Sequence, residues 1–325
     1  MTVSSTSPSA QSSATRTQTS AAVSVSSETA LPTSETKQAI LTQPLFVYNP
    51  EYIAFLNKSL ATRSPEEILE WALISLPGLV QTTAFGLTGL VILDMINKIR
   101  NRRQLAEHPV PLIFIDTLYH FQETLDVAKR ASEKYDAPLQ VYHPQGHDNV
   151  ASFESHHGQE LWKTDADVYD YVVKVEPGRR AAIENNAQVL ITGRRRSQGA
   201  SRAAIPILEI DSGVTPAVLK LNVLADWDYA RVWKYVQENG VPYNVLHDRN
   251  YKSIGDWHST QPTAESEGER DGRWKGEAKT ECGLHKDYFK MRANYLAAAK
   301  KRKLTESTDF VLVDSEEPSS KKIDS

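Results

Sequence analysis

The sequence is poor in cysteine: Cys282 is the single one among 325 residues. One cysteine cannot form an intramolecular disulfide, so a disulfide-stapled secreted fold is excluded. It also cannot supply the several thiolates of an iron–sulfur cluster or of a cysteine-rich zinc site. We therefore predict a protein with no bound cluster or metal that works in a reducing compartment, the cytoplasm.

Long hydrophobic runs are also missing, and the longest is far shorter than the roughly 18 residues of a membrane span. No positively charged start followed by an apolar stretch marks a secretory signal. The net charge is −4, so no positive field of the whole chain draws the protein onto nucleic acid. The composition predicts no membrane or nucleic-acid partner, and any anion site must come from a local cluster of cations.

Aromatic residues are missing from 1–37, a stretch with 11 Ser and 8 Thr. Such a segment cannot bury enough apolar surface to offset its ordering entropy. We predict a disordered tail over 1–43; a transit peptide is the less favoured alternative because arginine is scarce there. The polar stretch 304–325 is also predicted to be a disordered tail. One domain would then occupy 44–303.

Inside this domain, apolar runs alternate with segments of helical spacing. We expect strands over 79–84, 111–115, 139–142 and 188–192. We expect helices over 65–76 with Ser64 as N-cap, over 87–100 and 121–134, between Asp226 as N-cap and Gly240, and over 287–300. This alternation predicts an α/β fold with a Rossmann-like, mainly parallel sheet flanked by helices. Ligands of such sheets bind at the carboxyl ends of the strands.

Two of the loops at these ends carry small polar residues. Thr82, Thr83 and Gly86 follow the first strand, where hydroxyls and glycine let backbone amides approach an anion at a helix start. The alternative is an ordinary tight turn, since no Gly-Lys-Ser/Thr completes a phosphate loop. Asp116 and Thr117 follow the second strand. The Asp116 carboxylate either accepts from a ribose hydroxyl or caps the next helix.

Arginines gather around the fourth strand. Six lie within 24 residues, and the last four of them follow the strand: Arg179, Arg180, Arg194, Arg195, Arg196 and Arg202. Arginine binds phosphate or sulfate through two parallel hydrogen bonds and stays charged. Their place after a strand favours a site for a small polyanion over a solvated basic face or an RNA-binding patch.

Cys282 lies in a polar segment of the sequence, between Lys279 and His285. A free thiol with a pKa near ~8.5 is only slightly ionised at neutral pH, and nearby cations increase its thiolate fraction. This setting favours a reactive nucleophile over the inert buried residue that a lone cysteine more often is. The spacing of His156, His157 and His258 fits no standard metal site, so we expect them to make hydrogen bonds or lie at the surface.

Taken together, these segments resemble the phosphoadenylyl-sulfate (PAPS) reductase family of the adenine-nucleotide α-hydrolase-like, PP-loop-related superfamily. The resemblance runs from about residue 45 to 300. It is carried by Glu281-Cys282-Gly283-Leu284-His285, Lys174-Val175-Glu176-Pro177, Arg195-Arg196 with Gln198 and Ser201-Arg202, Asp226-Trp227-Asp228, and Tyr251 with Gly255-Asp256. It departs from many relatives at the threonine loop after the first strand and at Leu118, where glycine is common.

This resemblance implies an oxidoreductase of sulfate assimilation, toward cysteine and methionine biosynthesis. Cys282 would attack the sulfur of PAPS, and a thiol of thioredoxin or glutaredoxin would release sulfite from the resulting S-sulfonate. The catalytic segment would span about 250–300, and the protein would be a homodimer by analogy. The implied site comprises Cys282, Tyr251 and His285 as catalytic residues, with Thr82, Thr83, Gly86, Asp116, Thr117, Arg195, Arg196, Ser201, Arg202, Arg270, Arg273 and Lys279 binding substrate.

The missing cysteines favour the 3′-phosphorylated substrate, because relatives that reduce adenylyl sulfate typically carry an iron–sulfur cluster. Three alternatives stay open at this point: an adenylyl-sulfate reductase, an ATP-using adenylyltransferase on the same fold, and a non-catalytic nucleotide sensor or RNA-binding protein. The adenylyltransferase would have no use for Cys282.

Overall fold

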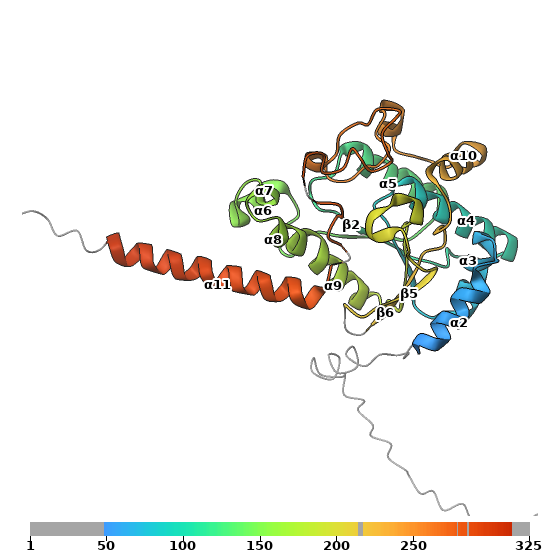
Figure 1. Ribbon diagram of the computed structural model, residues 1–325, viewed down its shortest axis with the longest axis horizontal. Helices are drawn as coiled ribbons and strands as arrows, with labels where there is room; N and C mark the ends of the chain where they lie inside the picture. The colour runs from blue at the N-terminus through green and yellow to red at the C-terminus, as the bar shows by residue number, and fades with distance from the viewer. Residues whose placement is uncertain (1–48, 214–216, 278, 285, 314–325) are drawn as a thin grey trace, which may run out of the picture.

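Six strands form one sheet in the order β3-β2-β1-β4-β6-β5 (Figure 1). The computed structural model describes residues 49–213, 217–277, 279–284 and 286–313. The strands are β1 (Leu79–Thr82), β2 (Leu112–Ile115), β3 (Leu139–Tyr142), β4 (Val189–Ile191), β5 (Leu208–Asp211) and β6 (Val218–Leu221). All neighbours pair in parallel except β5, an edge strand antiparallel to β6. The predicted mainly parallel sheet is therefore confirmed.

Helices connect and cover the strands. They are α2 (Pro50–Leu60), α3 (Pro65–Ser75), α4 (Leu87–Arg103), α5 (Gln122–Tyr135), α6 (Val150–His157), α7 (Leu161–Thr164), α8 (Ala166–Asp170), α9 (Glu176–Glu184), α10 (Tyr229–Asn239) and α11 (Tyr288–Val313). A π-helical turn, η1 (Tyr171–Val175), joins α8 to α9, and short 3₁₀ turns are η2 (Arg196–Gln198), η3 (Ala200–Arg202), η4 (Val245–Arg249) and η5 (Trp257–Ser259). None of the helices in the described ranges is long and apolar enough to cross a membrane.

The core is built on both faces of the sheet. In β2, Leu112 and Phe114 belong to the larger apolar cluster, while Ile113 and Ile115 belong to a smaller one, because successive side chains of a strand point to opposite faces. The larger cluster surrounds α4, in which 10 of 17 residues are buried. On the other face α9 contributes Ala181. The sheet is thus covered by helices on both sides, as its continuous apolar strands predict.

Local signals fix several helix ends. Ser64 caps α3 as predicted: its Oγ accepts from the Glu67 amide at 3.2 Å, and the Glu67 carboxylate accepts from the Ser64 amide at 2.8 Å. The prediction that Asp226 is the N-cap of a later helix, α10, is wrong by two residues. Asp228, not Asp226, accepts from the Arg231 amide, at 2.7 Å. Asp226 instead pairs with Arg196.

Figure 1 shows α11 projecting beside α8, away from the sheet. It packs on α8 and η1 through Met291 and Tyr295. The predicted tail over 1–43 lies outside the described residues. α11 continues past 303, the expected end of the domain, to Val313, and the rest of the stretch 304–325 lies outside the described residues. The domain boundaries stay a prediction.

Candidate active site

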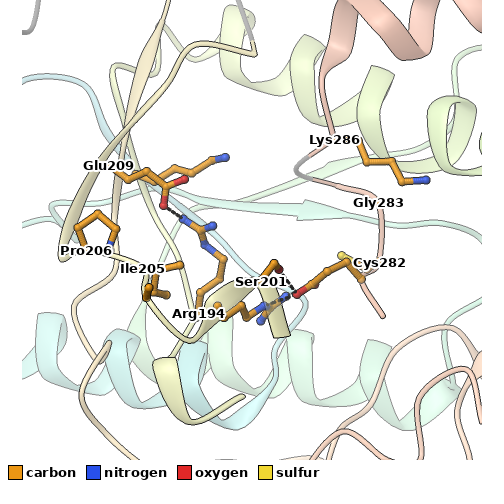
Figure 2. A pocket seen from close by; sticks show the side chains of 12 residues that line it. Arg194, Ser201, Ile205, Pro206, Glu209, Cys282, Gly283 and Lys286 are labelled. Carbon is orange, nitrogen blue, oxygen red and sulfur yellow. Dashed lines mark hydrogen bonds and ion pairs between the residues drawn. The ribbon is translucent and has the colours of Figure 1, made fainter. Parts of the chain in front are cut away.

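Cys282 is partly exposed and lines two cavities. The smaller cavity, of about 220 Å³, lies at the carboxyl ends of β1 and β2. The larger cavity, of about 470 Å³, contains Arg194, Ser201, Glu209 and Lys286 (Figure 2). Arg202 is the other residue that lines both. A thiol in this position can be reached from two spaces.

The smaller cavity combines hydroxyls from strand ends with cations from later segments. Its polar lining includes Thr82, Thr83, Thr117, His120, Lys174, Arg202, Asp256, Arg270 and Arg273. A parallel sheet brings strand ends that are distant in sequence to one edge, which explains why Thr82 and Thr117 meet there. Hydroxyl donors and four cationic side chains around one thiol suit an anionic ligand with a polar body.

The loop after β1 owes its tight form to Thr83. Its Oγ1 accepts from the Phe85 amide at 2.9 Å, and Phe85 has a positive φ of 54°. Only glycine fits at 89, because a Cβ there would lie 2.7 Å from this oxygen. Gly86 is the N-cap of α4 and supplies no side-chain acceptor. The first amides of α4 therefore lack a side-chain cap.

Lys174 and Asp256 form a buried ion pair on the wall of the smaller cavity, with Nζ and Oδ2 2.7 Å apart. Thr117 donates to the same carboxylate at 2.6 Å. Burial alone would raise the pKa of Asp256, but Lys174 and then His120 hold it well below its usual range. Burial alone would lower the pKa of Lys174, but Asp256 and Asp170 raise it on balance. Both groups are therefore charged at neutral pH.

The π-helical turn η1 carries Lys174. Such turns are rare and often occur at functional sites, because the widened turn redirects a side chain. Asp256 lies just before η5. Lys174 and Asp256 thus come from different elements. Together they form a charged part of the cavity wall that Cys282 also lines.

Arg273 is the unpaired cation of the smaller cavity. Within the described part of the chain, its Nε is buried without a hydrogen-bond partner, and no carboxylate forms an ion pair with its guanidinium. The group lies over the Trp274 ring at 4.3 Å from the centroid and against Gly255, where a Cβ would lie 2.1 Å away. Burial lowers the pKa of Arg273, which Asp256 and Cys282 oppose. A desolvated guanidinium without an anion is costly, so an anionic ligand would stabilise it.

Glu281, the residue before Cys282, forms ion pairs with two other arginines of the site. Its carboxylate accepts from Arg202 at 2.9 and 2.6 Å, from Arg270 at 3.3 Å and from Ser201 at 3.1 Å. Figure 2 shows Ser201 and Cys282 among the residues that line the larger cavity. Burial alone would raise the pKa of Glu281, but Arg202 and then Arg270 lower it. The carboxylate marks a place where two arginines hold an anion beside the cysteine.

The structure brings most of the predicted site residues together. Thr82, Thr83, Thr117, Arg202, Arg270, Arg273 and Cys282 line the smaller cavity, and Ser201 lines the larger one. Lys279 lies close by and donates to Asp170 at 2.8 Å. His285 lies outside the described residues.

Besides Lys279, five predicted residues line neither cavity. Arg195 is 1% exposed and pairs with Glu269 at 2.6 Å, while Arg196 donates to the Ile205 carbonyl. Asp116 caps its own turn by accepting from the Leu118 amide at 2.9 Å, and the Tyr251 ring packs on Phe121. Gly86 belongs to the neighbouring turn. Of the three consecutive arginines, Arg195 and Arg196 thus hold the loop together, and Arg194 lines the larger cavity.

Sequence reasoning missed the carboxylates and one lysine. Lys174, Asp256 and Glu281 stand in the segments that carry the family resemblance, and that was the available signal. Asp170, fully buried one residue before η1, gave none. Its contacts connect positions more than 100 residues apart.

His258 makes a hydrogen bond, as predicted. Its Nε2 lies 3.0 Å from the Tyr169 hydroxyl, and its ring stacks on Trp162 at 4.1 Å between centroids. His156 and His157 pack against one another, with ring centroids 4.6 Å apart. Across the described ranges, no group of three or more His, Cys, Asp or Glu is arranged to hold a metal ion.

The buried His258 predicts that stability depends on pH. Burial lowers its pKa to about 4 from 6.5. Between these two pKa values His258 binds more protons in the unfolded chain, so its contribution to stability should fall by about 1–2 kcal/mol as the pH drops from 7 to 5. Urea unfolding of wild type and His258→Gln checks this, and the decrease should be smaller in the variant. Equal decreases in the two proteins would contradict the assignment to His258. Asp256 does not contribute in this pH range, because unfolded carboxyls titrate near ~3.9.

Comparison with known proteins decides the family. The profile of the phosphoadenosine phosphosulfate reductase domain matches residues 78–262. The phosphoadenosine phosphosulfate reductase of Emericella nidulans is 46% identical over 272 residues, covering 83% of this chain and 86% of the relative. That of Saccharomyces cerevisiae is 48% identical over 226 residues, covering 68% and 84%. The chain belongs to the phosphoadenosine phosphosulfate reductase family.

A solved structure agrees with this assignment. PAPS reductase from Candida auris, crystallised as a phosphate complex, is similar with a TM-score of 0.60 and 46% identity, covering 66% of this chain and 99% of that one. The match of the PAPS reductase profile contains Thr82, Lys174, Arg202 and Asp256 but ends before Cys282. The position of Cys282 beside the smaller cavity is therefore an independent observation.

Proposed function

We propose that this protein is a PAPS reductase that converts 3′-phosphoadenylyl sulfate into sulfite and adenosine 3′,5′-bisphosphate, with Cys282 as the nucleophile. One observation carries the proposal: the single thiol of the chain lines the same cavity as Arg273, a cation without an anionic partner among the described residues. Family membership supports the reaction class, and this geometry supports the choice of residues.

In the first step the Cys282 thiolate attacks the sulfur of the sulfuryl group. A new sulfur–sulfur bond forms as the bond from sulfur to the bridging phosphate oxygen breaks. Adenosine 3′,5′-bisphosphate leaves with that electron pair, and the cysteine becomes an S-sulfonate. The leaving phosphate oxygen is weakly basic, so the step requires no strong acid.

The main barrier is repulsion between a thiolate and a substrate with about four negative charges. Lys174, Arg202, Arg270 and Arg273 line the cavity and oppose this repulsion. Fixed cations in a water-poor site stabilise developing charge strongly, because they need little reorganisation. We assign Thr82 and Thr83 to the 5′ side of the nucleotide and Thr117 to the ribose, since all three face the same cavity.

Release of sulfite needs a second thiol. A thiolate of an external dithiol protein, thioredoxin or glutaredoxin, attacks the Cys282 sulfur, and sulfite leaves with the electron pair. The donor's other thiol then frees Cys282 and leaves the donor as a disulfide, so the donor supplies both electrons. This chain has no second cysteine that could do so.

The larger cavity offers this donor a separate approach. Cys282, Gly283 and Lys286 line it (Figure 2). While the nucleotide and the sulfonate occupy the smaller cavity, an attacking thiol needs a second path to the same sulfur. In keeping with the family resemblance, we also propose a cytoplasmic homodimer that uses no iron–sulfur cluster.

The test combines sulfite release with detection of the intermediate. The protein is mixed with PAPS or with adenylyl sulfate, with and without reduced thioredoxin. We expect sulfite with PAPS and thioredoxin together, and one added SO₃ group on the Cys282 peptide by mass spectrometry when thioredoxin is omitted. A bound nucleotide without any covalent adduct would refute the covalent route. Faster turnover of adenylyl sulfate than of PAPS would refute PAPS as the substrate.

A further inference from the structure

Asp170 is a buried carboxylate at the end of α8 that lines neither cavity. Its side chain is 0% exposed, and three lysines surround it. The Nζ of Lys279 lies 2.8 Å from Oδ1, that of Lys286 3.1 Å from Oδ2, and that of Lys174 3.6 Å from Oδ1. A buried charge needs such pairing.

Two of these lysines flank the cysteine in the chain. Lys279 precedes Cys282 by three residues and Lys286 follows it by four. Gly283, the next residue after the thiol, packs directly on the same carboxylate: a Cβ there would lie 2.4 Å from Oδ2, and its φ is +85°. A single side chain therefore contacts the cysteine segment before, just after and beyond the thiol.

The third lysine connects this contact to the smaller cavity. Lys174 lies between Asp170 and Asp256, and both it and Asp256 line the cavity together with Cys282. The segment that carries the thiol and the cation proposed to meet the substrate are thus positioned by one buried group. Glu281 provides a second attachment on the arginine side.

We propose that Asp170 is the positioning residue of the Cys282 segment, holding the thiol at the edge of the smaller cavity without contacting substrate. This inference rests on the proposed nucleophilic role of Cys282. Misplacing a reacting group by about 1 Å can slow a reaction on the order of 10²-fold, so loss of this anchor should act on the chemical step rather than on nucleotide binding.

The experiment compares Asp170→Asn with Asp167→Asn in the full chain. Asp167 lies on the same helix, is 60% exposed and contacts Lys286 at 2.9 Å, so it is a matched control for removing one carboxylate. Three quantities are measured: binding of adenosine 3′,5′-bisphosphate, the rate of S-sulfonation in a single turnover without thioredoxin, and the rate of Cys282 alkylation by iodoacetamide.

For Asp170→Asn we expect S-sulfonation to slow by about 100-fold while nucleotide binding stays within about two-fold. Alkylation should become several-fold faster, because the released segment exposes the thiol. These opposite changes distinguish a positioning role from general damage to the fold. Asp167→Asn should stay within about two-fold of wild type in all three measurements.

Gly283→Ala tests the same contact from the other side, because its Cβ collides with the carboxylate. It should reproduce slow S-sulfonation and fast alkylation. The double variant Asp170→Asn/Gly283→Ala should form the S-sulfonate no more than about two-fold more slowly than Asp170→Asn alone. Wild-type rates in Asp170→Asn would overturn the inference. If Asp170→Asn loses nucleotide binding, Gly283→Ala decides, and wild-type behaviour there overturns it.

Failure of the proposed function gives a different pattern. If wild type binds nucleotide but forms no S-sulfonate, the nucleophile assignment fails. The alkylation rates still report whether Asp170 holds the segment, because they need no substrate.

Discussion

Replacing Cys282 by serine is expected to abolish sulfite release, with a loss on the order of 10⁴-fold or more, while binding of adenosine 3′,5′-bisphosphate persists. A serine hydroxyl is not ionised at neutral pH and lacks the nucleophilicity of a thiolate. It also cannot form the S-sulfonate from which a donor thiol releases sulfite. The chain has no other cysteine to substitute for it.

The measurement pairs sulfite assay with nucleotide binding and thermal unfolding of the variant. Binding should persist because the cations and threonines of the smaller cavity are unchanged. Cys282 is partly exposed and is absent from the apolar core, so unfolding should barely change. Sulfite release by Cys282→Ser at even one hundredth of the wild-type rate would contradict the nucleophile assignment and leave the site without its proposed chemistry.

The sequence allowed the sheet to be predicted well because its signals are local. The strand β3 was expected at its observed bounds, and the capping box at Ser64 marks where α3 begins. The edge of the sheet was harder. β5 and β6 were not predicted: the apolar residues of β5 alternate with the acidic residues Glu209 and Asp211, and β6 contains Lys220, a charge that interrupts its apolar run. Lys220 is tolerated in the core because it pairs with Asp211 at 2.6 Å.

Residue types that bind anions could be predicted, but their pairing could not. Arg195 and Arg202 lie seven residues apart with the same chemistry, yet Arg195 is buried against Glu269 while Arg202 lines both cavities. Which arginine turns away from the cavities depends on Glu269, a carboxylate 74 residues away from Arg195. The same applies to Lys174, whose partner Asp256 is distant in sequence, so its place on the cavity wall becomes apparent only in the fold.

Lys174→Met is the second change expected to have a large effect, slowing S-sulfonation by about 10²–10³-fold. Methionine keeps much of the length of the side chain but removes a positive charge from the wall that faces the thiol. The thiolate and the sulfuryl group would then meet with one cation fewer. Single-turnover mass spectrometry of the Cys282 adduct measures the rate directly.

The substitution also leaves Asp256 charged and buried without its lysine, which can cost about 3–5 kcal/mol of stability. Lys174→Met combined with Asp256→Asn separates the two effects, because it removes both members of the pair. If Lys174 acts on the substrate, the double variant should regain stability yet stay slow in S-sulfonation. If the double variant instead regains the wild-type rate, Lys174 serves only to neutralise Asp256, and the positive charge that acts on the substrate must come from Arg202, Arg270 and Arg273.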